Sequence, residues 1–148
     1  MPTWKKLKRQ AILGELRAIE FFIHRDFEVY KQYTGKESAD LIVMKNGIIY
    51  RVECKSTSAR TNTNLGWKVT LVKNRHNTKT TRVYKFEDWK HNIDLLSVYI
   101  EPKDQIIMFH KEEIKDNTML SISDEMMEVR KDDDFIKYEG IYKETEEE

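Results

Sequence analysis

The sequence predicts an α/β fold in which an N-terminal helix packs on a mixed, largely antiparallel sheet, followed by further strands and a helix. Apolar residues recur at helical spacing over residues 4–25. Short β-branched runs separated by turn residues then predict several strands. An Asn-Gly pair at 46–47 lies between two of these runs, which is a strong signal for a β-hairpin.

The predicted elements follow in chain order. The helix at 4–25 contains Gly14, which costs about 1 kcal/mol relative to Ala and suggests a close approach to another element. Strands are predicted at 27–33, 40–45, 48–55, 67–72, 95–100 and 105–109. Polar composition predicts loops at 58–66 and 74–82, and the motif HKEEI at 110–114 predicts the start of a short helix.

Length and charge predict one domain with an uneven surface. A chain of 148 residues is expected to form a single domain, with a core at about 4–110 and an acidic C-terminal extension at about 121–148. The formal net charge is zero, but residues 51–90 contain 10 basic and 3 acidic side chains. A basic central region is compatible with a polyanionic partner, and a solvated charged surface is the alternative.

The cellular setting is predicted from two further features. Cys54 is the sole cysteine, which excludes an internal disulfide and a metal site built from several thiolates. No apolar run reaches the length of a membrane span, and the N-terminal WKKLKRQ is too polar for a secretory signal. We therefore expect a cytoplasmic, soluble protein with no membrane partner.

Two acidic residues occupy unexpected positions in the hairpin at residues 39–56, ADLIVMKNGIIYRVECKS. A two-residue type I′ turn would pair Lys45 with Ile48, and the same register would place Asp40 opposite Glu53. That pair would be non-hydrogen-bonded, with Cα atoms about 4.5 Å apart. Facing carboxylates repel, so stability alone does not explain them.

A divalent cation would turn this repulsion into attraction. Mg²⁺ takes oxygen ligands, commonly one or two carboxylates together with substrate phosphate. Lys55 shares a strand face with Glu53 and could hold a water or a phosphate oxygen near the metal. The pattern indicates metal-assisted phosphodiester hydrolysis. The alternative is a metal-independent structural protein in which Lys55 and Arg51 neutralise the acids as a surface ion network.

The motifs GELRAIEFF, ADLIV, NG and VECKST, in this order, resemble the core of the PD-(D/E)XK nuclease superfamily over about residues 8–57. The pattern is most like the small homing-endonuclease and Holliday junction resolvase branches. The resemblance implies a restriction-endonuclease-like core. Ala39 replaces the proline of the family pattern, but proline supplies no ligand atom, so the chemistry does not need it.

The resemblance also implies which residues form the site. The implied catalytic residues are Asp40, Glu53, Lys55 and Glu15. The implied metal ligands are Asp40, Glu53 and the main-chain carbonyl of Cys54. For Glu15, an ordinary exposed helix position is the alternative.

The function expected from these features is a Mg²⁺-dependent DNA endonuclease of the homing-endonuclease type, with Mn²⁺ able to substitute. A Holliday junction resolvase or another structure-specific nuclease is the alternative within the same class. A non-catalytic nucleic-acid-binding protein that retains the fold is the alternative from another class. The expected partners are double-stranded or branched DNA and a second copy in a homodimer.

A set of basic and hydroxyl side chains follows the hairpin in sequence. Lysine and arginine on a loop can contact phosphates without reading base sequence. Each basic residue has an ordinary surface role as its alternative, and the two hydroxyl residues have the alternative of ending the strand. The candidate DNA contacts are Lys68, Lys73, Arg75, Lys79, Arg82, Ser56 and Thr57.

Overall fold

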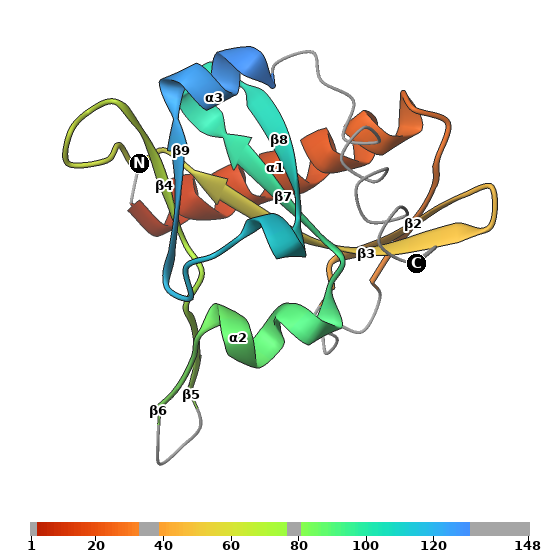
Figure 1. Ribbon diagram of the computed structural model, residues 1–148, viewed down its shortest axis with the longest axis horizontal. Helices are drawn as coiled ribbons and strands as arrows, with labels where there is room; N and C mark the ends of the chain where they lie inside the picture. Colours follow the sequence, from red (N-terminus) through yellow and green to blue (C-terminus); the bar gives the residue numbers. More distant parts are fainter. Residues whose placement is uncertain (1–2, 33–38, 77–80, 131–148) are drawn as a thin grey trace, which may run out of the picture.

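The computed structural model describes residues 3–32, 39–76 and 81–130 (Figure 1). Helix α1 (Thr3–Ile23) lies against a five-stranded sheet of order β1-β2-β3-β7-β8. β3 and β7 are parallel, and the other neighbouring pairs are antiparallel. The predicted N-terminal helix on a mixed, largely antiparallel sheet is therefore confirmed. The strands are β1 (Glu28–Lys31), β2 (Leu41–Lys45), β3 (Ile48–Thr57), β7 (Leu95–Ile100) and β8 (Gln105–His110).

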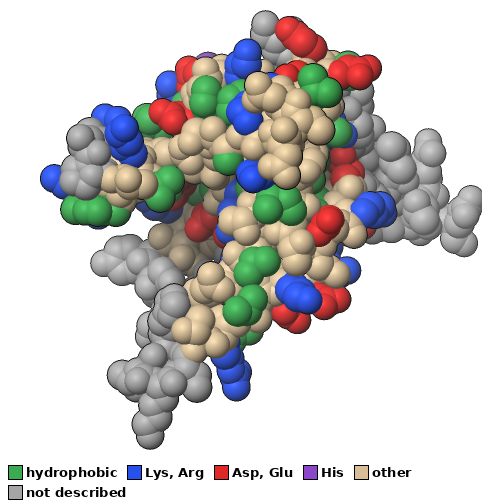
Figure 2. All heavy atoms as spheres, turned by 90° about the vertical axis from the view of Figure 1, so that its left-hand side faces the viewer, with side chains coloured by type: hydrophobic (Ala, Val, Ile, Leu, Met, Phe, Trp, Pro, Cys, Tyr) green, Lys and Arg blue, Asp and Glu red, His purple; other side chains and the backbone are tan. Residues whose placement is uncertain are grey.

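The remaining elements lie in the connection from β3 to β7 and in the segments that follow β7. β4 pairs with β9, outside the main sheet, and β5 pairs with β6 in a hairpin that extends from the body of the protein (Figures 1 and 2). Short helices α2 and η1 then lead into β7. The bounds are β4 (Gly66–Thr70), β5 (Lys73–His76), β6 (Thr81–Tyr84), α2 (Phe86–Trp89), η1 (Lys90–Asn92), η2 (Glu101–Lys103), η3 (Lys111–Glu113), β9 (Met119–Ser123) and α3 (Asp124–Val129).

Two sequence expectations about these segments are wrong. Residues 74–82 were expected to form a loop, but their described parts belong to β5 and β6. An exposed polar hairpin has no buried face. Its sequence therefore lacks the alternation of apolar and polar residues by which a strand is predicted. The expected helix at 110–114 is only the single turn η3, between β8 and a non-helical segment.

Apolar side chains pack on both faces of the main sheet. Phe22 and Ala18 of α1 cover one face, where they meet Leu41, Val43 and Val52. The core of the other face includes Trp67, Trp89, Leu96, Val98, Ile122 and Met127. No helix in the described ranges is long and apolar enough to cross a membrane.

The C-terminal part of the described chain belongs to this second core. Ile122 of β9 is fully buried, and Met127 of α3 is 4% exposed. The expected core, which ended near residue 110, is therefore too short. It omits β9 and α3, which pack in the same core as β4. The acidic residues of the expected extension beyond residue 130 lie outside the described residues.

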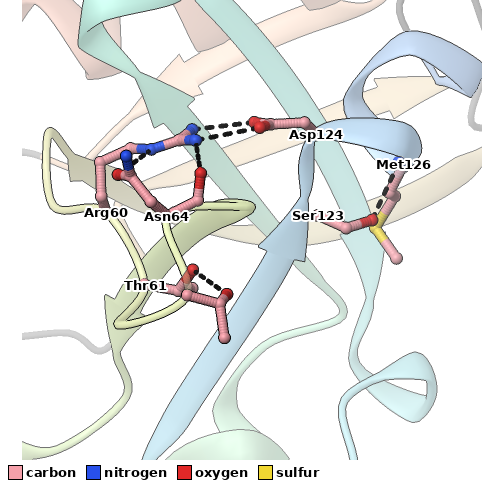
Figure 3. A network of polar contacts seen from close by, with 7 residues as sticks. Arg60, Thr61, Asn64, Ser123, Asp124 and Met126 are labelled. Atoms are coloured by element: carbon pink, nitrogen blue, oxygen red, sulfur yellow. Dashed lines mark hydrogen bonds and ion pairs between the residues drawn. The ribbon is translucent and has the colours of Figure 1, made fainter.

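Polar contacts tie the C-terminal elements to the loop that precedes β4 (Figure 3). The guanidinium of Arg60 donates to both carboxylate oxygens of Asp124, at 2.9 and 3.0 Å, and also to the side chain and main chain of Asn64. The hydroxyl of Ser123 accepts from the N–H of Met126 at 3.0 Å and caps α3. These contacts fix β4, β9 and α3 as one layer beside the main sheet.

Gly14 marks the closest approach of α1 to the sheet. A Cβ atom at this position would lie 3.2 Å from the Cβ atoms of Ser56 and Tyr99. The predicted close backbone approach is therefore confirmed. It allows the residue that follows, Glu15, to lie near the strand that carries Glu53.

The hairpin register is also as predicted. Lys45 pairs with Ile48, and the ladder continues to the pair Leu41–Val52. Asn46 and Gly47 have φ values of 52° and 80°. Positive φ at both central residues is the mark of a type I′ turn, which matches the right-handed twist of the two strands.

A half-buried ion pair joins β3 to the segment that enters β7. Asp94 accepts hydrogen bonds from the main-chain N–H of Arg51 at 2.8 Å and from its guanidinium at 3.1 Å. Burial acts to raise the pKa of Asp94, but the hydrogen bonds from Arg51 outweigh it and the pKa is lowered. This pair therefore stabilises the parallel arrangement of β3 and β7.

Replacing Asp94 with Ala is expected to lower the free energy of unfolding by about 1–3 kcal/mol, because the main-chain and side-chain donors of Arg51 lose their acceptor. The folded-state pKa is below the unfolded value, so the stabilisation by the carboxylate is present near neutral pH. It is lost as the pH falls from neutral through the ordinary aspartate pKa of about 3.9 and below the lowered folded-state pKa. Urea unfolding of both proteins across this range is the measurement, and a gap that does not narrow in acid would contradict the role of the ion pair.

Candidate active site

The candidate site lies where β2 and β3 separate. Their ladder ends at the pair Leu41–Val52, although β3 continues to Thr57. The chain bends at Asp40, whose N–H donates to the carbonyl of Val52 at 2.9 Å. Asp40 therefore does not face Glu53 as a ladder pair, and that detail of the prediction is wrong. The reason is the bend, which takes the main chain out of the sheet one residue before the expected pair.

The carboxylate of Asp40 reaches β3 by another route. Its Oδ2 accepts the main-chain N–H of Cys54 at 2.8 Å. In a β-strand the N–H and C=O of one residue point to the same edge, so the carbonyl of Cys54 is directed to the side where Asp40 lies. The separation of the strands thus gathers a carboxylate and a main-chain oxygen donor at one edge.

Glu53 is the most deeply buried of the candidate acids, with 6% of its surface exposed. Its Oε1 lies 3.0 Å from the ammonium nitrogen of Lys73, and its Oε2 has no hydrogen-bond partner among the described residues. Burial raises the pKa of Glu53, and the negative charge of Asp40 raises it further. An unpartnered buried carboxylate oxygen is costly and requires an explanation.

The charges around Asp40 show that the predicted residues converge. Burial raises the pKa of Asp40, the hydrogen bond from Cys54 opposes this, and the charge of Glu15 raises the pKa again. The ammonium groups of Lys73 and Lys55 act in the opposite direction. Glu15, Asp40, Glu53 and Lys55 therefore lie close enough to act on one another, as the sequence predicted.

Glu15 approaches this cluster from α1. Its side chain is 25% exposed, and Oε1 lies 3.0 Å from the ammonium nitrogen of Lys31. The Glu15 charge also contributes to the pKa of the Cys54 thiol, which burial raises well above its ordinary value. Helix α1 thus adds a third carboxylate, that of Glu15, beside those of Asp40 and Glu53.

Lys55 lies in a restricted environment beside an aromatic ring. Burial lowers the pKa of Lys55, and the negative charge of Glu53 partly restores it. Its ammonium nitrogen is 5.7 Å from the ring centroid of Trp89, and that of Lys73 is 4.2 Å from the same centroid. Sequence reasoning missed Trp89, because a buried tryptophan carries no sequence signal that distinguishes a site residue from a core residue.

The predicted DNA contacts occupy two places. Ser56, Thr57 and Lys68 border a pocket of about 220 Å³ that also includes Lys55. The hydroxyl of Thr57 donates to the carbonyl of Lys68 at 2.7 Å and accepts from Ala59, so it serves the fold. Of the hairpin residues, Lys73 points into the candidate site, Arg82 is exposed on β6 and Arg75 belongs to β5. Lys79 lies outside the described residues.

The oxygen donors at this site fit Mg²⁺. The structure describes no group of three or more His, Cys, Asp and Glu side chains able to hold a metal ion. Asp40 and Glu53 nevertheless provide two carboxylates, and the Cys54 carbonyl faces the same edge. Mg²⁺ needs no more protein ligands than these, because it retains waters and takes phosphate oxygens from substrate. The unpartnered Oε2 of Glu53 is the observation that favours a cation here.

Replacing Asp40 with Asn is expected to leave the thermal stability of the metal-free protein unchanged or to raise it. Asn retains an oxygen that can accept the Cys54 N–H, and it removes a buried charge that is repelled by Glu53. Mg²⁺ is expected to raise the melting temperature of the wild type, and the substitution should abolish that rise. Thermal melts with and without Mg²⁺ test both expectations, and a clear loss of metal-free stability would favour a structural ion network.

Comparisons with known proteins identify the family of the chain and a similar fold. The PD-(D/E)XK endonuclease family matches residues 6–141. The solved structure of a bacterial homing endonuclease, I-Ssp6803I, is similar with a TM-score of 0.63 and 19% sequence identity, over 79% of this chain and 78% of that chain. No curated protein matches the sequence significantly. Because the family match spans most of its length, the chain belongs to the PD-(D/E)XK endonuclease family.

Proposed function

We propose that the protein is a Mg²⁺-dependent DNA endonuclease of the homing-endonuclease type that hydrolyses phosphodiester bonds. The observation that carries the proposal is the buried Glu53, whose free Oε2 lies in a cluster with Asp40 and the ammonium of Lys55. Membership of the endonuclease family supports the chemistry. The similarity to a homing endonuclease supports DNA as the substrate.

Each residue has a distinct task in the proposed reaction. Asp40, Glu53 and the carbonyl of Cys54 would hold the cation, which supplies charge neutralisation and lowers the pKa of a water when bound. Lys55 would orient a water or a phosphate oxygen and stabilise the negative charge that develops on the phosphate. Glu15 would accept a hydrogen bond from a water at the same edge and orient it.

DNA would lie along the surface that joins the site to the β5–β6 hairpin. Lys68 borders the same pocket as Lys55, and Arg82 is exposed on β6 of the hairpin. These side chains would position the phosphate backbone without specifying base sequence. Small nucleases that cut both strands of a duplex commonly pair two active sites, which favours a symmetric homodimer. Sedimentation of the protein with and without duplex DNA tests that assembly.

The deciding experiment incubates the purified protein with plasmid DNA, a four-way junction and an RNA duplex, with Mg²⁺, with Mn²⁺ and with a chelator. Metal-dependent cleavage of plasmid is the expected result. Cleavage confined to the junction would favour the resolvase alternative. Binding to DNA without cleavage under every condition would favour a non-catalytic protein that retains the fold, and cleavage that survives the chelator would exclude the proposed metal.

A further inference from the structure

The acid pair already has a cationic neighbour, the ammonium of Lys73. Its nitrogen lies 3.0 Å from Oε1 of Glu53, and the two side chains are 23% and 8% exposed. Lys73 therefore neutralises the carboxylate of Glu53, one of the two that the proposed metal would use.

The position of Lys73 is fixed by more than the ion pair. Its ammonium also lies 4.2 Å from the ring centroid of Trp89, a favourable cation–π distance. The Trp89 ring is 4% exposed, and its N–H donates to the carbonyl of Leu71 at 2.9 Å, which holds the ring in place. Lys73 thus has an aromatic contact that does not depend on Glu53.

Lys73 comes from outside the segment that carries the other candidate residues. It begins β5, where it pairs with Tyr84 at the base of the β5–β6 hairpin (Figure 1). Asp40, Glu53 and Lys55 belong to the β2–β3 hairpin and the bend before it. Lys73, which the sequence predicted only as a DNA contact, therefore lies directly beside Glu53.

We infer that Lys73 is a resident counter-ion of the acid pair that a divalent cation must displace from Glu53. This inference rests on the proposed function. An ammonium and a divalent cation repel each other, so each weakens the binding of the other to the same carboxylate. Lys73 limits the repulsion between Asp40 and Glu53 before metal binds, and the same contact weakens metal binding. When a metal displaces the Lys73 ammonium from Glu53, the Trp89 ring remains as its contact.

The test titrates Mn²⁺ into the complete protein without DNA, at mildly alkaline pH, and follows heat and tryptophan fluorescence. Replacing Lys73 with Met is expected to tighten Mn²⁺ binding about tenfold, or about 1.4 kcal/mol. The wild-type fluorescence should change on metal addition, and the change should be lost in Trp89→Phe and reduced in Lys73→Met. Lys90→Met is the matched control, because Lys90 is exposed next to Trp89 in the chain; its Mn²⁺ affinity should equal that of the wild type.

Unchanged or weaker Mn²⁺ binding by a folded Lys73→Met protein would overturn the inference. If that variant does not fold, Lys73→Arg decides, because a guanidinium can hold a carboxylate with two hydrogen bonds and should weaken Mn²⁺ binding. Mn²⁺ affinity equal to the wild type in Lys73→Arg would then overturn the inference. Wild-type protein that neither binds Mn²⁺ nor cleaves DNA would instead refute the proposed function and the inference together.

Discussion

Replacing Glu53 with Gln is expected to lower the rate of metal-dependent DNA cleavage about a thousandfold, while DNA binding persists. Gln has nearly the same size as Glu, but it removes the negative charge that would hold the cation. Glu53 is buried and its Oε2 is unpartnered among the described residues, so its charge is available to a bound cation. Single-turnover cleavage with protein in excess measures the effect without interference from product release.

Glu20→Gln is the matched control for this experiment. Glu20 lies on α1, its side chain is 58% exposed, and its carboxylate is 3.8 Å from the guanidinium of Arg17. The same chemical change at this position should leave the cleavage rate at the wild-type value. A Glu53→Gln protein that cleaves as fast as the wild type would show that the site is misplaced.

Replacing Phe22 with Ala is expected to lower the free energy of unfolding by about 3–5 kcal/mol. Phe22 is fully buried, and its ring centroid lies 5.3 Å from that of Phe21 and 5.4 Å from that of Phe27. The substitution leaves a cavity where α1 meets the sheet, and α1 carries Glu15. Urea unfolding followed by circular dichroism gives the loss directly.

Leu16→Ala is the control on the same helix. Leu16 is 52% exposed, so truncating it removes little buried surface. Its effect on the free energy of unfolding should stay within about 0.5 kcal/mol. Equal losses in the two variants would mean that α1 does not pack through Phe22 as described.

The candidate site places function and stability in opposition. Burial raises the pKa of both Asp40 and Glu53, so their charged forms destabilise the folded protein near neutral pH. Lys73 offsets part of this cost through its ion pair with Glu53. Substitutions that remove the charge of Asp40 or Glu53 are therefore expected to raise the stability of the fold while they abolish the proposed DNA cleavage. Such a trade-off between stability and activity is common at functional sites.

The β2–β3 hairpin could be predicted from sequence because its determinants are local. Asn46-Gly47 selects the turn, and the turn selects the register that runs to Leu41–Val52. Helix α1 could also be predicted from the sequence, because its apolar spacing and Gly14 indicate the face that meets the sheet. The order of acidic and basic motifs along these elements was sufficient to predict the family.

The rest depended on contacts between segments far apart in the chain. The bend at Asp40 gives its carboxylate to the Cys54 N–H, and no local pattern marks where a strand leaves a sheet. The positions of Lys73 and Trp89 beside Glu53 and Lys55 require the whole connection from β3 to β7 to fold back on the sheet. β9 was missed because its pairing partner, β4, precedes it by about fifty residues.

By itself, the sequence determined the α1 helix and the β2–β3 hairpin with its register, and it predicted Glu15, Asp40, Glu53 and Lys55 as the candidate site. Turn chemistry and side-chain periodicity act over a few residues, so a single sequence records them. Tertiary structure alone decided that Asp40 binds the edge of β3 and that Lys73 pairs with Glu53. The physical reason is that burial and charge pairing depend on which distant segments pack together, and these interactions have no fixed spacing along the chain.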